Sequence, residues 1–374
     1  MNRYKRILVT GGAGFIGSHL VDELINKKYK VRILDNLDSQ VHPRGIKPSY
    51  LNPKAEFIKG DVTSQKDWLK ALSGVDVIFH EASVVGVGQS MYQIEHYTKV
   101  NTLGTAILLD ILANQKHGIK KIIVAASMSS YGESMYKCPT HGHIRPTLRS
   151  DTRLRQRKWE QICPVCKENV VPVGTPETAD QICNSIYAIN KKDQEDMIMT
   201  FGRAYGIPTV ALRYFNVYGP RQSLSNPYTG VAAIFLSRLM NDNRPVIYED
   251  GLQTRDFVSV HDIVQANILS LESDKANGQV FNVGSGRPVS ILEIAEILAK
   301  KLGLQIKPEI TNQFRSGDIR HCGADISKIK SLLSYTPSVS FEDGMEELIE
   351  WSNGQKAVDK FDQALKELTS RKLA

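Results

Sequence analysis

A short apolar run, a glycine-rich turn and a helical pattern follow one another near the start of the chain, and this order constrains the fold most. The run is Arg6–Thr10, the turn is Gly11-Gly-Ala-Gly-Phe-Ile-Gly17, and the helical pattern follows at 18–25. Glycines in such a turn allow a tight bend, close approach of the backbone to a pyrophosphate, and packing of the helix on its strand. The helix N-terminus then faces the phosphates. The stretch predicts a dinucleotide-binding strand–turn–helix unit.

A second apolar run, Lys30–Asp35, ends in an acid 18 positions after Gly17. A carboxylate at this point is placed to hold the adenosine ribose hydroxyls of a dinucleotide. It would repel a 2′-phosphate, so the sequence favours NAD over NADP. The alternative is an ordinary glycine turn followed by a surface acid.

Further apolar runs alternate with helical patterns along the first two thirds of the chain. This alternation predicts an α/β fold with a doubly wound parallel sheet of the Rossmann type, with ligands at the carboxyl ends of its strands. The expected strands are 55–62, 75–80, 121–126, 208–214 and 279–283, with a long helix at 92–117. We expect residues 1–137 and 177–215 to form the NAD-binding domain. Residues 216–374 would form a smaller α/β substrate domain with some segments returning to the sheet, and a charged, solvated helix would begin near 355.

Composition limits the partners of this chain. Its 374 residues are 41% hydrophobic and 23% charged, as in soluble globular proteins, and the net charge is +7. The charge suits an anionic small molecule, although surplus surface lysine is the favoured explanation. No basic run with interleaved aromatic residues predicts nucleic-acid binding, and no apolar stretch approaches the roughly 18 residues that span a membrane. The five cysteines are unevenly placed and argue against a secreted disulfide framework. We expect a cytoplasmic protein.

Tyr187 and Lys191 are four residues apart, so on a helix they lie on the same face. A nearby ammonium favours the phenolate and lowers the tyrosine pKa from its usual value of about 10. The pair could therefore take a proton from a sugar or alcohol hydroxyl while a hydride leaves the same carbon. One such match is expected by chance in a chain of this composition, so the dinucleotide-binding pattern carries much of the weight.

Residues 138–176 are polar and irregular, and they hold two short-spaced groups of metal-ligand residues. Cysteine and histidine pairs separated by about twenty residues are typical of a structural zinc site. The candidates are Cys138, Cys163, Cys166 and either His141 or His143, with His141 preferred. Four such ligands would explain how a segment with few apolar residues stays ordered. The alternative is a set of unrelated surface cysteines and histidines.

Together these motifs resemble the extended short-chain dehydrogenase/reductases, and among them the NAD-dependent nucleotide-sugar epimerases and dehydratases. The motifs are Thr10–Gly17, Asp35, Asp61-Val62, Asn101-x-x-Gly104-Thr105, Ser127, Tyr187-x-x-x-Lys191, Arg213–Pro220 and Arg255–Val258. The resemblance implies tightly held NAD, a nucleotide-diphosphate sugar as substrate and a homodimer formed through two long helices. It makes Ser127, Tyr187 and Lys191 the catalytic trio.

The resemblance also implies two sets of binding residues. The NAD-binding set is Gly11, Gly14, Phe15, Ile16, Gly17, Asp35, Asn36, Asp61, Val62, Ala82, Asn101, Tyr187 and Lys191. The nucleotide-sugar set is Gln89, Ser90, Ser129, Asn216, Arg221, Arg255, Arg315 and Asp318.

Met128 and Ser129 narrow the reaction, because the dehydratases of this family carry Asp and Glu there. Neither side chain can serve as a carboxylic acid or base, so the sequence favours 4-epimerisation over dehydration. The loop Val85–Met91 and the cysteine-containing insertion resemble those of dTDP-L-rhamnose 4-epimerases. UDP-glucose and UDP-glucuronate 4-epimerases, a dehydratase or dehydrogenase of nucleotide sugars, and a non-catalytic NAD-binding scaffold remain as alternatives.

Overall fold

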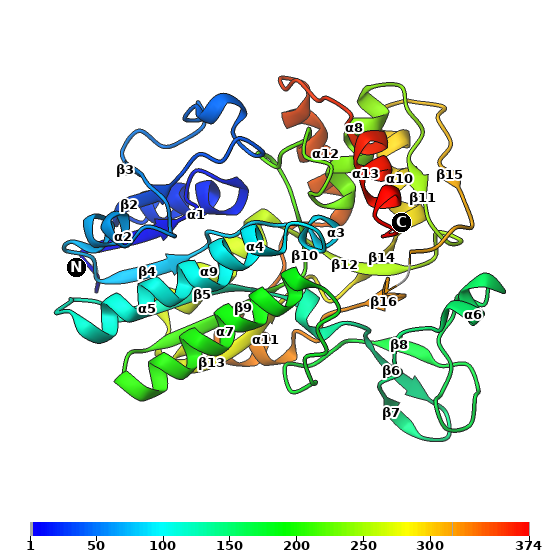
Figure 1. The fold of residues 1–374 in the computed structure, drawn as a ribbon, viewed down its shortest axis with the longest axis horizontal. Coiled ribbons are helices and arrows are strands. Elements are labelled where there is room, and N and C mark those ends of the chain that lie inside the picture. Colours follow the sequence, from blue (N-terminus) through cyan, green and yellow to red (C-terminus); the bar gives the residue numbers. More distant parts are fainter. Residues whose placement is uncertain (1–2, 316, 374) are drawn as a thin grey trace.

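The computed structural model describes residues 3–315 and 317–373, and a seven-stranded parallel sheet forms its centre (Figure 1). The strand order is β13-β9-β5-β4-β1-β2-β3, in which every neighbouring pair is parallel. The strands are β1 (Arg6–Thr10), β2 (Lys30–Asp35), β3 (Glu56–Lys59), β4 (Val77–His80), β5 (Lys121–Ser127), β9 (Thr209–Tyr214) and β13 (Gln279–Val283). The predicted α/β class and parallel sheet are confirmed.

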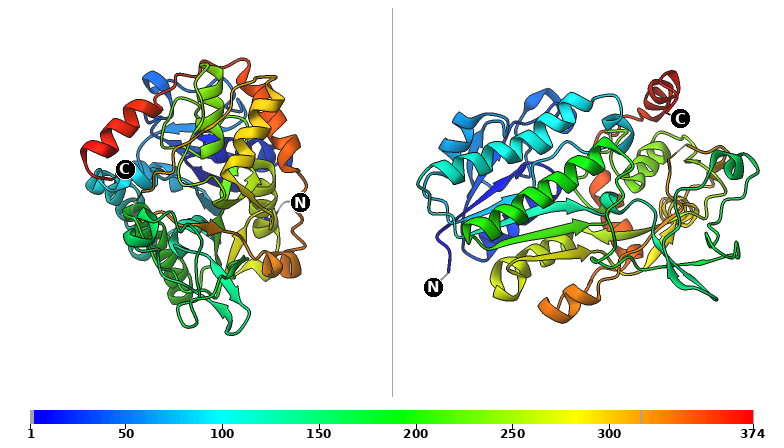
Figure 2. Two further views of the ribbon diagram at one scale, coloured as in Figure 1. Left: turned by 90° about the vertical axis from the view of Figure 1, so that its right-hand side faces the viewer. Right: turned by 60° about the horizontal axis from the view of Figure 1, so that its bottom comes forward.

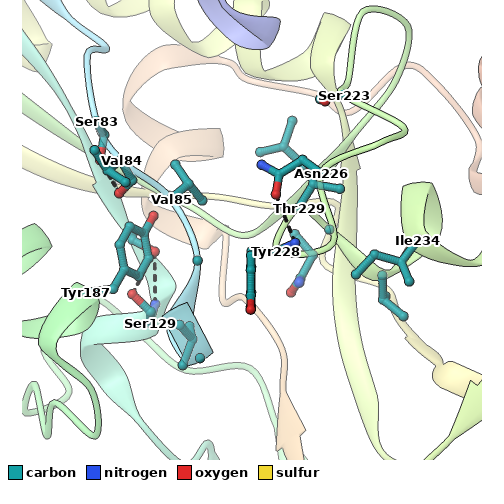
Figure 3. Close-up of a pocket in the computed structure, with 18 of the residues that line it drawn as sticks. Ser83, Val84, Val85, Ser129, Tyr187, Ser223, Asn226, Tyr228, Thr229 and Ile234 are labelled. Carbon is teal, nitrogen blue, oxygen red and sulfur yellow. Dashed lines mark hydrogen bonds between the residues drawn. The ribbon is translucent and has the colours of Figure 1, made fainter. Parts of the chain in front are cut away.

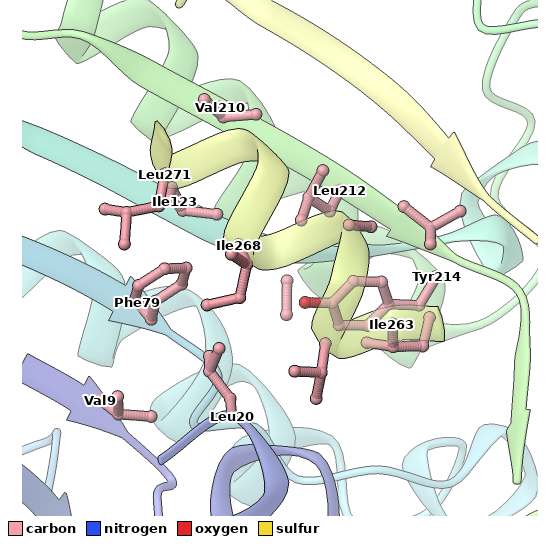
Figure 4. Close-up of a cluster of buried hydrophobic side chains, with 14 of the residues drawn as sticks. Val9, Leu20, Phe79, Ile123, Val210, Leu212, Tyr214, Ile263, Ile268 and Leu271 are labelled. Atoms are coloured by element: carbon pink, nitrogen blue, oxygen red, sulfur yellow. The ribbon is translucent and has the colours of Figure 1, made fainter. Parts of the chain in front are cut away.

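Helices cover both faces of this sheet (Figure 2). One face carries α1 (Phe15–Asn26), α9 (Val260–Glu272) and α11 (Ser327–Leu333), and the other carries α2 (Gln65–Leu72), α5 (Gly104–Asn114) and α7 (Ile186–Tyr205). Strands covered on both sides are mostly apolar, as in β4 and β9, whose residues are all buried. Figure 4 shows the core beneath α9, where Ile263, Ile268 and Leu271 pack on side chains of the central strands.

The helix expected over 92–117 is shorter and is not a single regular helix. It consists of α4 (Ile94–Tyr97), a π-helical segment (Thr98–Leu103) and α5. Asn101 lies in the π-helical segment, and its side chain turns towards the loop after β4 instead of continuing the helix surface. π-Helical insertions often occur where a helix side chain serves a binding site.

A smaller α/β unit lies beyond the carboxyl ends of the strands (Figure 1). Its strand β12 (Thr254–Ser259) pairs with β10 (Asn216–Tyr218), β14 (Pro288–Ser290) and β16 (His321–Cys322), and β11 (Val246–Ile247) pairs with β15 (Glu309–Ile310). The helices are α8 (Val231–Met240), α10 (Ile291–Lys301) and α12 (Phe341–Ser352), which share one apolar core. At the start of α10, the Ser290 hydroxyl caps the helix by accepting from the Glu293 N–H.

The cysteine-containing segment projects from the body as a small antiparallel sheet (Figure 1). Its order is β7-β6-β8, with β6 (Met135–Cys138), β7 (Gly142–Ile144), β8 (Val171–Val173) and a short helix α6 (Asp151–Arg155). Its apolar cluster is small, with Tyr136, Cys138, Cys163 and Val170 as the buried members. We refer to residues 138–176 as the insertion.

The expectation of a solvated C-terminal helix is wrong. Helix α13 (Phe361–Ser370) buries Ala364 and Leu368 against the body, because its apolar residues share one face. Short helical segments occur at Pro43–Gly45, Val87–Ser90 (α3), Met128–Tyr131 and Asp274–Ala276. Among the described residues, no helix is both long enough and apolar enough to cross a membrane.

Candidate active site

A cavity of about 810 Å³ runs from the glycine-rich turn, past the carboxyl ends of β4 and β5, to the smaller unit. Its volume falls within the range of small-molecule and cofactor sites. The predicted site residues that line it are Gly11, Gly14, Phe15, Ile16, Gly17, Asp35, Asn36, Val62, Ala82, Ser127, Ser129, Tyr187, Lys191, Asn216, Arg255, Arg315 and Asp318. The fold thus brings most of the predicted set to one continuous surface.

The glycine-rich turn leaves the N-terminus of α1 open towards the cavity. Gly14 caps this helix without a side-chain hydrogen bond, so free backbone N–H groups are available to an anion. Gly11 has φ +67°, and a Cβ atom there would lie 2.9 Å from the backbone nitrogen of Ala82. The turn therefore packs directly on the loop after β4. We call the turn Gly11–Gly17 and the N-terminus of α1 the glycine cradle, and its shape fits the pyrophosphate of a dinucleotide.

Asp35 lies at the end of β2 and orders the same turn. Its carboxylate accepts hydrogen bonds from the N–H of Ala13 at 3.0 Å and from the N–H of Leu37 at 2.8 Å. The neighbouring Asn36 donates to Asp61 at 3.0 Å. Asp61 does not line the cavity, but it holds the side chain of Asn36, which does.

Ser127, Ser129 and Tyr187 form the centre of the site, where β5 ends and α7 begins. The Ser129 hydroxyl donates to the Ser127 hydroxyl at 2.9 Å, and Ser127 is also hydrogen-bonded to the Tyr187 phenol. Ser90 holds the start of α7, because its hydroxyl accepts from the Tyr187 N–H at 3.1 Å. Figure 3 shows Tyr187 and Ser129 on one side of the cavity with Val84 and Val85, and Asn226 and Tyr228 across from them.

Lys191 does not lower the Tyr187 pKa in this structure, contrary to the sequence prediction. Its ammonium donates to the Ala125 carbonyl at 2.7 Å and to the Gln194 side chain at 3.0 Å. Burial raises the pKa of Tyr187 to about 12, against the opposing effect of the Ser127 hydrogen bond. Burial also lowers the pKa of Lys191 to about 8, although the Glu81 carboxylate opposes this change. The phenol is therefore protonated at neutral pH in the protein without its ligands.

The far end of the cavity carries polar groups suited to an anionic ligand. Asn216 has a buried amide oxygen with no hydrogen-bond partner among the residues that the structure describes. Such a group costs free energy unless a ligand or water satisfies it. Arg315 pairs with Asp318 at 2.9 Å and its guanidinium lies 4.7 Å from the centre of the Tyr248 ring. Arg255 donates to the carbonyl oxygens of the segment that follows Arg315.

Five predicted binding residues do not line the cavity. Gln89, Ser90 and Asn101 hydrogen-bond to residues around the cavity. The Asn101 side-chain oxygen accepts from the Val84 N–H at 2.8 Å. The Gln89 side chain hydrogen-bonds to Gln40 and Tyr97. Asp61 bonds to Asn36, as described above. Arg221 turns away, pairs with Asp22 of α1 at 2.8 Å and lies over the Tyr50 ring, so its expected contact with a diphosphate is not made here.

Sequence reasoning missed several cavity residues. Glu81 accepts from the Tyr214 hydroxyl at 2.9 Å, and burial raises its pKa to about 7. Its position directly after β4 is a signal that could have identified it, because strand ends of parallel sheets face ligands. Helix α13 also contributes Phe361, Ala364, Leu365 and Leu368. Nothing in its charged sequence indicated this placement, which depends on contacts such as Tyr92 with Glu367.

His80 is a buried residue whose protonation makes the unfolding free energy depend on pH. Burial, together with the charge of Lys191, lowers the pKa of His80 to about 3. The unfolded ring binds a proton below about pH 6.5 and the folded ring does not, so unfolding becomes easier as the pH falls. We expect His80→Gln to flatten the dependence of the unfolding free energy on pH between about 7 and 5, measured by denaturant titration. His117→Gln, at an exposed position, is the control; equal slopes in the two variants would contradict the prediction.

The structure brings together one complete set of predicted metal ligands. Single ligand atoms of Cys138, His141, Cys163 and Cys166 all lie within 4.8 Å of one another. The Cys138 sulfur is 3.6 Å from both the Cys166 sulfur and Nδ1 of His141, and the Cys163 sulfur is 3.5 Å from Nδ1 of His141. Tetrahedral zinc sites place their ligand atoms roughly 3.5–3.8 Å apart. His143 is not a member of this cluster.

Comparison with known proteins agrees with this geometry. The model of the NAD dependent epimerase/dehydratase family matches residues 7–150, and that of GDP-mannose 4,6 dehydratase matches residues 169–348. A dTDP-L-rhamnose 4-epimerase from Burkholderia thailandensis is 34% identical over 354 residues, which cover 93% of this chain and 94% of that protein. The chain belongs to the NAD-dependent epimerase/dehydratase family.

Solved structures of this family share the whole fold. The UDP-glucose 4-epimerase of Thermotoga maritima with UDP-glucose has a TM-score of 0.76 and 31% identity, covering 93% of this chain and 98% of that one. The UDP-glucuronic acid 4-epimerase of Bacillus cereus, in complex with UDP-glucuronic acid and NAD, has a TM-score of 0.75 and 30% identity, covering 93% and 99%. Our chain is thus an NAD-dependent nucleotide-sugar epimerase, and the glycine cradle and Asp35 are the part of its cavity that fits NAD.

Proposed function

We propose that this epimerase inverts C4 of a nucleotide-linked 6-deoxyhexose, with the interconversion of dTDP-L-rhamnose and dTDP-6-deoxy-L-talose as the first choice. The apolar part of the cavity lining, the apolar wall, carries this proposal. It includes Val84 and Val85, which lie beside Tyr187 (Figure 3), together with Val87, Met91 and Met128. Such a wall suits the methyl group of a 6-deoxy sugar, whereas a uronate would need a cation to pair with its carboxylate. The 34% identity to a dTDP-L-rhamnose 4-epimerase supports the same choice.

The competing substrates are the UDP-sugars bound by the structural relatives, UDP-glucose and UDP-glucuronic acid. A hydroxymethyl group on the substrate would leave a hydroxyl against the apolar wall without a partner, which costs free energy. Dehydration is disfavoured because Met128 and Ser129 follow Ser127, and neither can act as a carboxylic acid or base.

Three residues carry the proposed proton chemistry. Tyr187 acts as the phenolate, which removes the proton from the sugar C4 hydroxyl and returns it later, and Ser127 hydrogen-bonds both the Tyr187 oxygen and the sugar oxygen. Lys191 contributes a positive charge next to the cofactor site and is held there by Ala125 and Gln194. Bound NAD supplies the hydride acceptor and donor at C4, so no net oxidation takes place. Asn216, Arg255 and Arg315 bind the nucleotide diphosphate.

Incubation of purified protein with dTDP-L-rhamnose and with several UDP-sugars tests the proposal, without added cofactor. Products are separated by isomer-resolving chromatography and weighed by mass spectrometry. We expect a new isomer of unchanged mass from dTDP-L-rhamnose, formed faster than any isomer of a UDP-sugar. Loss of water would contradict the argument from Met128 and Ser129, and preference for UDP-glucuronic acid would contradict the argument from the apolar wall.

The four clustered ligands of the insertion form our proposed structural zinc site. Cys138 and Cys163 are buried, and the segment has too small an apolar core to explain its order. All four ligands come from the protein, which leaves no position open for catalysis and makes the site structural. Structural zinc contributes binding free energy of about 10 kcal/mol or more to small domains that fold around it.

We expect protein purified without added metal to contain about one zinc per chain. Cys163→Ser should lose most of it and lower the melting temperature, because one of four ligands and a buried thiolate are removed. Cys183→Ser is the matched control, because this thiol lies outside the cluster. Elemental analysis gives the metal content, and well below one zinc in the unaltered protein would remove the proposal.

A homodimer formed through α5 and α7 completes the proposal. These helices lie side by side on one face of the sheet, and Ile189 and Tyr205 of α7, with Leu103 of the π-helical segment before α5, are more than two fifths exposed. Large exposed apolar residues on neighbouring helices suit an interface between copies. We expect light scattering to give the mass of two chains, and Ile189→Glu to give the mass of one; a single-chain mass for the unaltered protein would contradict the proposal.

A further inference from the structure

The insertion contacts the segment that carries Arg315 and Asp318, through a buried arginine. Arg149 forms a two-point ion pair with Glu249, and both of its Nη atoms lie 2.8 Å from a carboxylate oxygen. The Arg149 side chain is 0% exposed and that of Glu249 is 4% exposed. Nη2 of Arg149 also donates to the Asp318 carbonyl at 3.0 Å. One side chain of the insertion therefore holds a cavity-lining carboxylate and the backbone next to Arg315.

A second side chain of the insertion, Glu160, binds the same segment further along. It accepts from Nε of the fully buried Arg320 at 2.9 Å, and it lies 3.1 Å from Nε2 of His321. Arg320 also reaches Glu249 at 2.9 Å, so both contacts of the insertion join in one network. The hydrogen bond from His321, together with the neighbouring Arg320, lowers the pKa of Glu160 to about 2. Glu160 is therefore ionised at neutral pH.

The smaller unit also holds this segment, because β16 pairs with β12 and Arg320 pairs with Asp250. Arg255 donates to the carbonyls of Ile319 and Arg320, at 2.9 and 3.0 Å. Glu249 has a left-handed backbone with φ +56°, a conformation that persists only where the surroundings hold it. Those surroundings are the side chains of Arg149 and Arg320, together with backbone hydrogen bonds to Asn312 and Gln313. The geometry around Arg315 thus depends in part on Arg149, which lies outside the smaller unit.

We propose that the insertion is a positioning element for the nucleotide end of the cavity, in which Arg149 and Glu160 hold Arg315 and residues 317–321 in place. The inference rests on the proposed function in one respect, the placement of a diphosphate near Arg315. Since the four metal ligands order the insertion, metal loading then sets the affinity for the nucleoside diphosphate. The glycine cradle is spared, because the contacts of Arg149 and Glu160 described above all lie in the insertion and the smaller unit.

Calorimetric titration of UDP and dTDP into the full-length, NAD-loaded protein tests this inference. A buried pair that loses one partner leaves an uncompensated charge, and misplacement of a binding group by about 1 Å can weaken its effect roughly 100-fold. We expect Arg149→Met to raise the dissociation constant for the preferred nucleotide at least tenfold while the bound NAD content stays unchanged. Arg155→Met is the matched control, an exposed arginine of the same insertion. The same loss should follow when the unaltered protein is stripped with a zinc chelator.

Glu160→Gln is a second variant for the case in which Arg149→Met does not fold. The Glu160 side chain is 49% exposed, so its replacement should destabilise the fold less than replacement of the buried Arg149. We expect a smaller loss of nucleotide affinity in this variant, with KM for the sugar nucleotide raised and kcat nearly unchanged. Equal nucleotide affinity in Arg149→Met, Glu160→Gln and Arg155→Met would overturn the inference. Parallel loss of NAD and nucleotide binding would also overturn it. Because nucleotide affinity is measured without turnover, a failure of the proposed epimerase substrate is distinguished from a failure of this inference.

Discussion

Tyr187→Phe is expected to reduce the rate of isomer formation about 1,000-fold while leaving the bound NAD in place. The phenol is the titratable group that shares a hydrogen bond with Ser127 at the centre of the cavity. Phenylalanine keeps the ring and its edge-to-face contact with Tyr97, so the fold should be retained. The measurement is the initial rate with dTDP-L-rhamnose, together with the absorbance of NAD released from denatured protein.

Tyr205→Phe is the control for this change, because it makes the same substitution on the same helix at an exposed position. It should leave the rate unchanged. A Tyr187→Phe rate within tenfold of the unaltered enzyme would mean that another group accepts the proton. Glu81 would then be the next residue to replace, since its pKa of about 7 suits a general base at neutral pH.

The pKa of Tyr187 shows where reasoning from sequence reaches its limit. Spacing placed Lys191 on the correct face of α7, but it could not show that Ala125 and Gln194 occupy the ammonium. Electrostatic effects depend on burial and on every neighbour, and burial has no simple sequence signature. The phenol needs a positive charge in the cavity before it can act as a base near neutral pH. Lys191 does not have that effect on the Tyr187 pKa in this structure.

The seven-stranded parallel sheet and the clustering of Cys138, His141, Cys163 and Cys166 were predicted well, because both depend on local signals. Apolar runs, glycine turns and short cysteine spacings are read directly from neighbouring residues. The nucleotide end was predicted less well, because the sequence does not show which of Arg221, Arg255 and Arg315 line the cavity. Only the fold shows that Arg221 pairs with Asp22 while the other two line the cavity. Helix α13 was misjudged for the same reason: an amphipathic helix does not reveal what its apolar face covers.

Gly17→Ala is the second change with a large expected effect, on both stability and cofactor binding. A Cβ atom at this position would overlap the Gly11 carbonyl oxygen and lie 2.8 Å from the Gly12 Cα atom. Both contacts are backbone, so no side chain can move aside, and the turn must open. We expect a loss of about 3 kcal/mol in unfolding free energy, at the upper end of the usual cost of overpacking. NAD should be lost on purification, because the displaced turn no longer presents the α1 N-terminus to the pyrophosphate.

Gly118→Ala separates this effect from the general cost of replacing a glycine. A Cβ atom there would lie 3.6 Å from the Val75 carbonyl oxygen, an ordinary contact. Its melting temperature and NAD content should match those of the unaltered protein. If Gly17→Ala instead kept its NAD and lost less than about 1 kcal/mol, the turn could yield without cost. The close packing of Gly17 on Gly11 would then not be what fixes α1 against β1, and the cradle would owe its shape to Asp35 and its hydrogen bond from Ala13.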